Sequence, residues 1–566
     1  MRPFSSSPLI SHIKNLPPSD KAVALLLASV VVILSVAGLY ALERMFLVEV
    51  PSYGGSLHEG VVGHPRFANP LLALSDADRD LVMLTYAGLM GYAADGTLVP
   101  VLAEGYEVSE DGTTYTFRLR KNAKFADGTG VSADDVVFTV EKAQDPSLRS
   151  PELANWASIR AEALDARTVR FTLPSPYAPF LADATLGILP ARLWRGVKNE
   201  EFPFSPLVQE PVGAGPFTVA DVVRDGNGTI TRYDLVANED YALGRPYLDR
   251  MRFTFFDDAE ALYEALRVGR VESGYGLAAQ AASEGVLIEV PYARVFGVFW
   301  NQVKEPVFAR LEVRKALSVA LDRGALVQEA LGGYGSEAYG PVPPGSLSAP
   351  VHEGVVLDRI EEAASLLEDG GWAYDADARV WKHDAAGELS VTLSTGNVPE
   401  LKAVAEHLRR DWEKLGVPVE IEVHEPSALA SDVIRPRAFG ALLFGMSVGR
   451  EHDLFAFWDS SEREAPGLNV AQYANRAADA LLEDIREEPD REKRSALLAE
   501  LDATIAEDYP AAFTHAPDFL YRIPKDLRGF ALSEVALPSD RLSGAASWYK
   551  RTEWVWPAFV KGVRSE

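Results

Sequence analysis

A strand, a helix and a second strand follow one another in residues 389–423, and this unit limits the folds open to the chain. Residues 389–393 alternate apolar and polar side chains, as a strand with one buried face does. Residues 401–415 then place leucine, valine and tryptophan at helical spacing and end at Gly416, and alternation returns over 417–423. Two strands joined through a helix form a parallel crossover, so the sequence predicts an α/β domain with a partly parallel sheet.

A second informative stretch, residues 86–140, combines turns, a strand and a capped helix. Asp-Gly pairs at 111–112 and 127–128 predict turns, because glycine tolerates the positive φ that turns require. Residues 115–120 alternate aromatic or aliphatic side chains with polar ones, which indicates a half-buried strand. Ser-Ala-Asp-Asp at 132–135 predicts a capping box. Its two aspartates are therefore expected to stabilise a helix N-terminus and not to form a catalytic pair.

Several motifs resemble those of one known family and occur in that family's order. Together with residues 86–140 they resemble the extracytoplasmic solute-binding proteins of family 5, the oligopeptide, dipeptide and nickel class. The resemblance extends from about Tyr53 to about Pro524. Beyond the first stretch it rests on Pro211–Phe217, where Ala214 replaces the usual threonine, and on Asn238–Asp249, Val313–Arg323 and Ala363–Trp372.

The resemblance implies an α/β fold of the periplasmic-binding-protein type, with two hinged lobes that close over a ligand in the cleft. It implies the larger class of this fold, which carries an extra subdomain. By analogy, lobe I comprises residues 55–88, 210–300 and 510–566. The extra subdomain spans residues 89–209, and lobe II spans residues 301–509.

An uncharged segment near the N-terminus, residues 22–42, has the length of a membrane-spanning helix. Positive charges that precede a span favour the cytoplasmic side, so residues 1–21 are expected to be cytoplasmic, residues 43–54 to form a tether, and the remainder to be extracytoplasmic. A single-pass protein of a bacterial cytoplasmic membrane follows. A cleaved signal peptide with a site at Ser35–Ala37 is the alternative, although the apolar run exceeds a usual signal core. The preceding positive charges are Arg2, Lys14 and Lys21.

The composition excludes several functions. The chain has 55 basic and 82 acidic residues, a formal charge of −27, which disfavours nucleic acid because phosphate binding requires basic surface. The same acidity favours solubility and, more weakly, cationic groups such as peptide amino termini. The absence of cysteine excludes disulfides, thiol catalysis and cysteine zinc sites. It also excludes a lipid-modified cysteine, so a membrane anchor must be the N-terminal helix.

Asp453 is the candidate partner for a ligand ammonium group. The resemblance places an aspartate that holds the ligand's amino terminus in this region, although Leu454 stands here in place of the family's common proline. The alternative role is a cap on the apolar run that follows. Removal of an ammonium partner would weaken binding by about 2–5 kcal/mol. Removal of a cap would cost only about 1 kcal/mol of stability.

Four further side chains are candidates for the cleft. Asn301 is expected near the lobe crossover, where it would bond a ligand backbone, and Trp300 precedes it. Trp458 is expected either to wall a side-chain pocket or to lie in the core. Arg450 is a candidate for binding a ligand carboxylate, with a surface position as the alternative. No metal or cofactor site is predicted.

The function that follows is capture of peptides by a monomeric, membrane-anchored binding protein that delivers them to the permease subunits of an ABC importer. The chain lacks the G-x-S-x-G, H-E-x-x-H and Walker motifs, which argues against an enzyme. Nickel chelate, haem and oligosaccharide remain alternative ligands. A membrane-anchored hydrolase, and a sensor or assembly factor that reuses the binding fold, remain alternatives from other classes.

Overall fold

The computed structural model describes residues 17–276, 285–345 and 359–557. The chain divides into two compact units. One comprises Met1–Gly55 together with Tyr549–Glu566, and the other comprises Ser56–Trp548. The predicted cytoplasmic segment 1–21 lies outside the described residues except for its last five.

The first unit contains the long apolar helix α2 (Pro18–Phe46), which includes the whole predicted span and extends it at both ends. Its window Pro18–Gly38 is apolar enough to cross a membrane, with a mean hydropathy of 2.3. Strand β1 (Val48–Ser52) follows and pairs antiparallel with β23 (Arg551–Val555). The predicted tether is therefore partly a strand. The last described residues of the chain pair with it, whereas the sequence had assigned them to lobe I.

The second unit is built on one sheet of twelve described strands, which is both parallel and antiparallel. Strands from distant parts of the sequence alternate in it, so the sheet forms only when the whole unit is assembled. Strands β13 (Val286–Pro291) and β15 (Gly335–Glu337) pair with β22 outside the main path. The main order is β20 (Val419–His424), β19 (Val391–Gly396), β21 (Ala441–Ser447), β14 (Arg294–Trp300), β22 (Ala511–Ile523), β12 (Ser273–Tyr275), β2 (Ser56–Val62), β11 (Arg250–Phe256), β10 (Ile230–Ala237) and β9 (Phe217–Arg224).

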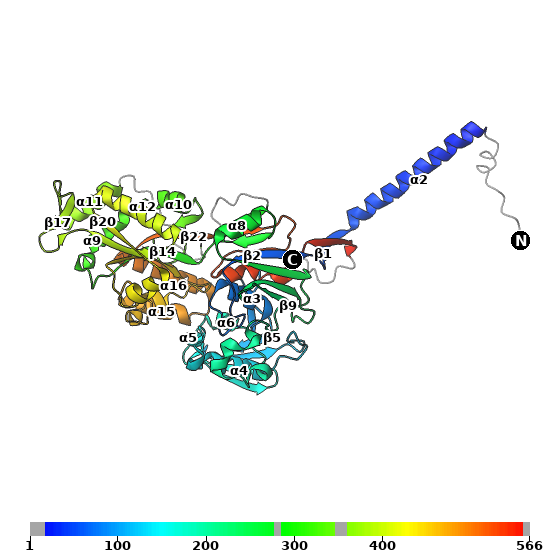
Figure 1. Ribbon diagram of the computed structural model, residues 1–566, viewed down its shortest axis with the longest axis horizontal. Coiled ribbons are helices and arrows are strands. Elements are labelled where there is room, and N and C mark those ends of the chain that lie inside the picture. Colours follow the sequence, from blue (N-terminus) through cyan, green and yellow to red (C-terminus); the bar gives the residue numbers. More distant parts are fainter. Residues whose placement is uncertain (1–16, 277–284, 346–358, 558–566) are drawn as a thin grey trace. The chain divides into compact units, whose positions relative to one another are not determined.

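The long strand β22 joins the two halves of this sheet. Its first residues pair with β14 and β15, and its last residues pair with β12 and β13. We call the half with β14, β15, β19, β20 and β21 lobe II, and the half with β2 and β9–β13 lobe I. Helices α9 (Leu311–Val319), α10 (Arg323–Ala330), α11 (Arg359–Asp369) and α12 (Pro399–Leu415) belong to lobe II, and α3 (Asp76–Thr85) and α8 (Ala259–Arg267) to lobe I (Figure 1).

The predicted strand–helix–strand unit is confirmed in lobe II. Strands β19 and β20 pair in parallel, and α12 connects them. The helix ends at Gly416, whose φ of 85° lies in the left-handed region that glycine adopts at low cost. Its apolar stripe is buried in the lobe II core, as the spacing predicts: Leu401, Val404, Leu408, Trp412 and Leu415.

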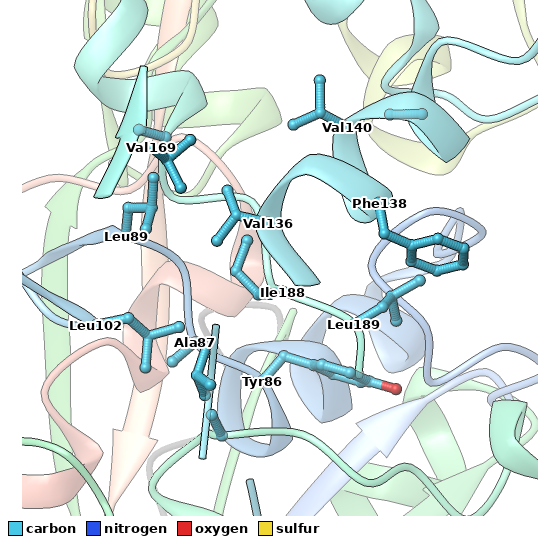
Figure 2. Close-up of a cluster of buried hydrophobic side chains, with 14 of the residues drawn as sticks. Tyr86, Ala87, Leu89, Leu102, Val136, Phe138, Val140, Val169, Ile188 and Leu189 are labelled. Carbon is cyan, nitrogen blue, oxygen red and sulfur yellow. The ribbon is translucent and has the colours of Figure 1, made fainter. Parts of the chain in front are cut away.

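The predicted strand and helix of residues 86–140 are confirmed. Strand β6 (Thr114–Leu119) lies in a four-stranded antiparallel sheet of order β5 (Ala103–Val108), β6, β8 (Thr168–Thr172) and β7 (Arg160–Asp165). Helix α4 (Ala133–Ala143) begins with the predicted capping box, in which Ser132 and Asp135 each accept the other's backbone N–H. The Asp135 carboxylate also accepts from the Ala191 N–H at 2.8 Å. Figure 2 shows the α4 side chains Val136 and Phe138 in the same hydrophobic cluster as Tyr86. The β5–β8 sheet and α4 are therefore scaffold.

A buried ion cluster ties four elements together: β2, α3, η7 and β22. Arg541, in the short 3-10 helix η7 (Pro538–Leu542), donates to both carboxylate oxygens of Asp80 on α3 at 2.7 and 2.6 Å. Its Nε donates to Glu59 of β2 at 2.9 Å. Glu59 also accepts from the Tyr521 hydroxyl of β22 at 2.9 Å. All three charged side chains are buried completely, so each carboxylate depends on Arg541 for its counter-charge.

Candidate ligand-binding cleft

A cavity of about 530 Å³ lies where lobe I and the β5–β8 sheet face lobe II. Its volume falls in the range of roughly 300–1,000 Å³ that is usual for ligand pockets. The end of α3, strand β3 (Met90–Tyr92) and the segments before β7 and after α6 (Phe180–Asp183) line one side. The segment after β21 lines the other. The polar and aromatic lining includes Tyr86, Tyr92, Glu152, Asn155, Asp183 and Arg450.

Side chains of the segment after β21 reach across the cleft to lobe I. Arg450 Nε lies 3.2 Å from Asp540 Oδ2, and its guanidinium carbon lies 4.3 Å from the centroid of the Tyr92 ring. His452 Nε2 lies 3.3 Å from Glu534 Oε1. These contacts connect the lobes beside the cavity. Of the five ligand-binding residues predicted from the sequence, Arg450 is the one that lines this cavity.

Asp453 is held in a network that spans the same gap. Arg486 of α15 (Arg476–Glu487) donates to both of its oxygens at 2.8–3.1 Å. The Tyr177 hydroxyl, from the segment after β8, donates to it at 3.4 Å, and the Phe455 N–H donates at 3.1 Å. The last bond is an Asx-type contact just before α14 (Phe455–Trp458), whose N-cap is Leu454 and not Asp453. A ligand ammonium would therefore compete with Arg486 for this carboxylate.

The other three predicted residues lie in the interior of lobe II. Asn301 is 1% exposed, donates to the Arg437 carbonyl at 2.9 Å, and accepts from two backbone N–H groups of the following turn. Trp300 and Trp458 are fully buried in hydrophobic clusters. Trp300 and Asn301 are buried because β14 is paired on both edges by β21 and β22, and the Trp458 ring packs against Phe299 of β14 at a centroid distance of 6.0 Å. None of the three lines the cavity described above.

The structure brings together three polar residues that the sequence did not single out as ligand contacts. Asp183, Glu152 and Tyr86 all line the cavity. Burial, with the negative charge of Glu152 next in importance, raises the pKa of Asp183 to about 8. Burial also raises the pKa of Glu152. Tyr86 begins the stretch interpreted as scaffold, and the two acids have no local signal that distinguishes them among 82 acidic residues.

A second cavity of about 530 Å³ adjoins the first. Asn155 and Asp183 line both, so Asp183 lies at their junction. The second cavity is bounded by residues 173–177 on one side and by Phe455 and Arg486 on the other. Among the residues that the structure describes, no group of three or more histidine or acidic side chains is arranged to hold a metal ion.

Comparison with known proteins identifies the family. Residues 97–462 match the model for bacterial extracellular solute-binding proteins, family 5 middle. The oligopeptide-binding protein AppA of Bacillus subtilis (strain 168) is 28% identical over 496 residues, which cover 85% of this chain and 89% of that protein. Heme-binding protein A of Haemophilus influenzae is 27% identical over 454 residues, 73% of this chain and 77% of that one.

Comparison with solved structures identifies the same kind of protein. The structure of AppA from Bacillus subtilis in complex with a nonapeptide matches with a TM-score of 0.70 and 27% identity, covering 88% of this chain and 99% of that one. The substrate-binding protein CtaP from Listeria monocytogenes matches with a TM-score of 0.74 and 25% identity, covering 88% and 100%. The predicted periplasmic-binding-protein fold and non-catalytic role are thereby confirmed, and the chain belongs to the family 5 solute-binding proteins, which work outside the cytoplasm.

Proposed function

We propose that the protein captures peptides in the cleft between lobes I and II and delivers them, as a monomer, to the permease subunits of an ABC importer. The observation that carries this proposal is the pair of adjoining cavities that meet at Asp183 and Asn155. Together they offer an elongated site with polar groups on both sides, which suits an extended chain with repeated backbone donors and acceptors. The likeness to an oligopeptide-binding protein supports the same ligand class.

Haem is the second candidate ligand, because one relative is a heme-binding protein. The charge of the site argues against it. Haem carries two anionic propionates, and the cavity presents Glu152 and Asp183. Its two arginines, Arg450 and Arg79, are already paired with Asp540 and Asp76. A cationic or zwitterionic ligand fits this lining better.

The test is ligand binding to the full-length protein in detergent. Titration calorimetry with trialanine, a nonapeptide, hemin and nickel–histidine would compare the candidate classes directly. We expect saturable binding of at least one peptide, with the peptide recovered intact by mass spectrometry. Saturation by hemin or nickel–histidine without peptide binding would contradict peptide capture, and recovery of cleaved peptide would support a hydrolase.

We further propose that α2 remains as a membrane anchor. Its described apolar side chains are exposed, and its apolar window of 21 residues matches the thickness of a bilayer. Membrane fractionation with N-terminal sequencing of the mature protein tests this. An intact N-terminus in the membrane fraction is expected. A mature chain that begins after Ala37 would instead establish a cleaved signal peptide.

Asp453 remains a predicted partner of the ligand amino terminus, and its replacement tests that role. If a bound ammonium displaces Arg486, Asp453→Ala should weaken peptide binding by about 2–5 kcal/mol. The exposed Asp377→Asn has the same change in net charge and serves as the control. Unchanged peptide affinity in Asp453→Ala would leave this residue with a structural role, in which it holds Arg486 and Tyr177 across the cleft.

A further inference from the structure

The cleft contains a partly exposed carboxylate that has one buried oxygen and forms no ion pair among the described residues. Asp183 Oδ2 is buried and has no hydrogen-bond partner among the residues that the structure describes. The charges that act on it include those of Glu152, Asp453 and Glu451, all negative, and that of Arg486. Arg486, however, donates to both oxygens of Asp453. A buried carboxylate in this position is costly unless it is protonated or paired with a cation.

A second unpaired group faces the same cavity. The Tyr86 side chain is 3% exposed and lines the cavity, and its hydroxyl has no hydrogen-bond partner within the described parts of the chain. Figure 2 shows the hydroxyl directed away from Val136 and Leu102, at the edge of the hydrophobic cluster. Burial raises the pKa of this hydroxyl, so it stays neutral and offers both a lone pair and a proton.

We propose that Asp183, with Glu152 beside it, forms a subsite for a cationic amino group of the ligand. The inference rests on the proposed function and specifies its substrate class as peptides that carry a free amino terminus or a lysine side chain. An ammonium group has three donors and no acceptor, which matches the acceptor oxygens of two carboxylates. For the single amino terminus of a peptide, this subsite is the alternative to Asp453, whose carboxylate is paired with Arg486.

Proton release should accompany binding at this subsite. Burial raises the pKa of Asp183 to about 8, so near neutral pH the carboxyl of the empty cleft is largely protonated. A bound cation favours the ionised form, and the proton then leaves to solvent. Affinity should therefore rise with pH up to about 8. The groups around Asp183 and Glu152 that enter this balance are Glu451, Asp453, Arg486, Tyr92, Tyr177 and, acting on Glu152, Arg79 of α3.

The decisive variant is Asp183→Asn, which keeps the shape of the side chain and removes its charge. Calorimetry on the full-length protein would use trialanine and N-acetyl-trialanine, with Asp377→Asn as the matched control. We expect Asp183→Asn to weaken trialanine binding about 30-fold or more. The variant should leave N-acetyl-trialanine unaffected.

Two further probes distinguish an amino terminus from a lysine side chain, and failure of the subsite from failure of the proposed peptide capture. If N-acetyl-Ala-Lys-Ala also binds in an Asp183-dependent way, the subsite accepts a lysine side chain as well as an amino terminus. Asp183-dependent binding of 1,5-diaminopentane without any peptide binding would uphold the subsite and overturn peptide capture. Equal losses for the free and acetylated peptides, or wild-type trialanine affinity in Asp183→Asn, would overturn the subsite. Failure of every probe to bind would overturn both.

An independent measurement uses the wild-type protein alone. Trialanine binding at pH 7 in phosphate and in Tris buffer should give apparent enthalpies that differ by the heat of buffer protonation, which reports a released proton. The same difference should be absent in Asp183→Asn. An enthalpy independent of the buffer in the wild-type protein would contradict the proposal.

Discussion

Two pairs of carboxylates in the second unit differ in their counter-charge and in their burial. Glu59 and Asp80 are fully buried and share Arg541, whereas Glu152 and Asp183 are partly exposed and form no ion pair within the described residues. Asp80 is more deeply buried than Asp183, yet its pKa rises only to about 6 because Arg541 opposes the effect of burial. The pKa of Asp183 rises to about 8. Burial alone does not determine the protonation state of a carboxyl group, because a cation in contact with it offsets the effect of burial.

The difference also separates scaffold from site. The Arg541 cluster joins β2, α3, η7 and β22 within lobe I, and every charge in it is satisfied internally. Glu152 and Asp183 line a cavity between the β5–β8 sheet and lobe II, where a bound ligand can supply the positive charge that pairs with them. We therefore expect substitutions in the first pair to change stability and substitutions in the second to change binding.

The largest expected effect is on Arg541. The Arg541→Met variant would leave Glu59 and Asp80 buried without a cation, so we expect the free energy of unfolding to fall by about 3–5 kcal/mol. Urea denaturation followed by tryptophan fluorescence measures this. Arg195→Met, at an exposed ion pair with Asp134, provides the control and should leave the midpoint unchanged. Equal midpoints for the two variants would remove the distinction between the pairs.

Within a single pH unit, a smaller effect is expected in the pH dependence of Asp183→Asn without ligand. The folded-state pKa of Asp183 lies above its model value of 3.8, so the folded state retains a proton that the unfolded state has lost. Wild-type stability should therefore fall as pH rises between 3.8 and about 8, by up to about 1.4 kcal/mol per pH unit. The variant should lack this contribution and match the wild type at pH 4. If the wild type and the variant show parallel curves of stability against pH, the Asp183 carboxylate is compensated in the folded state.

The smallest effects are expected at a third carboxylate pair, Asp134 and Asp135, where backbone groups and solvent supply the compensation. Ser132→Ala removes one half of the capping box of α4 and should cost about 1 kcal/mol. Asp134→Asn should not change the denaturation midpoint measurably, because Asp134 and its partner Arg195 are exposed. A large effect of Asp134→Asn would mean that exposure is a poor guide to which carboxylates matter in this protein.

The sequence by itself determined the local structure. The capping box at Ser132–Asp135, the alternating strand over 115–120, the strand–helix–strand unit ending near Val423, and the apolar helix at 22–42 were all predictable. Each depends on residues only a few positions apart, so periodicity and capping signals contain the information needed. The motifs also indicated the family, which the comparisons then established.

Only the tertiary structure decided which polar groups are compensated and which are not. Tyr86, Glu152 and Asp183 meet at one cavity from three separate segments, and Arg541 reaches Asp80 from 461 positions away. Asp453, the strongest candidate from the sequence, forms an ion pair with Arg486. Asn301 and Trp300 are buried because β14 is paired on both edges. The charge state of a carboxylate depends on burial and on its neighbours in space, and neither is a property of its position in the chain.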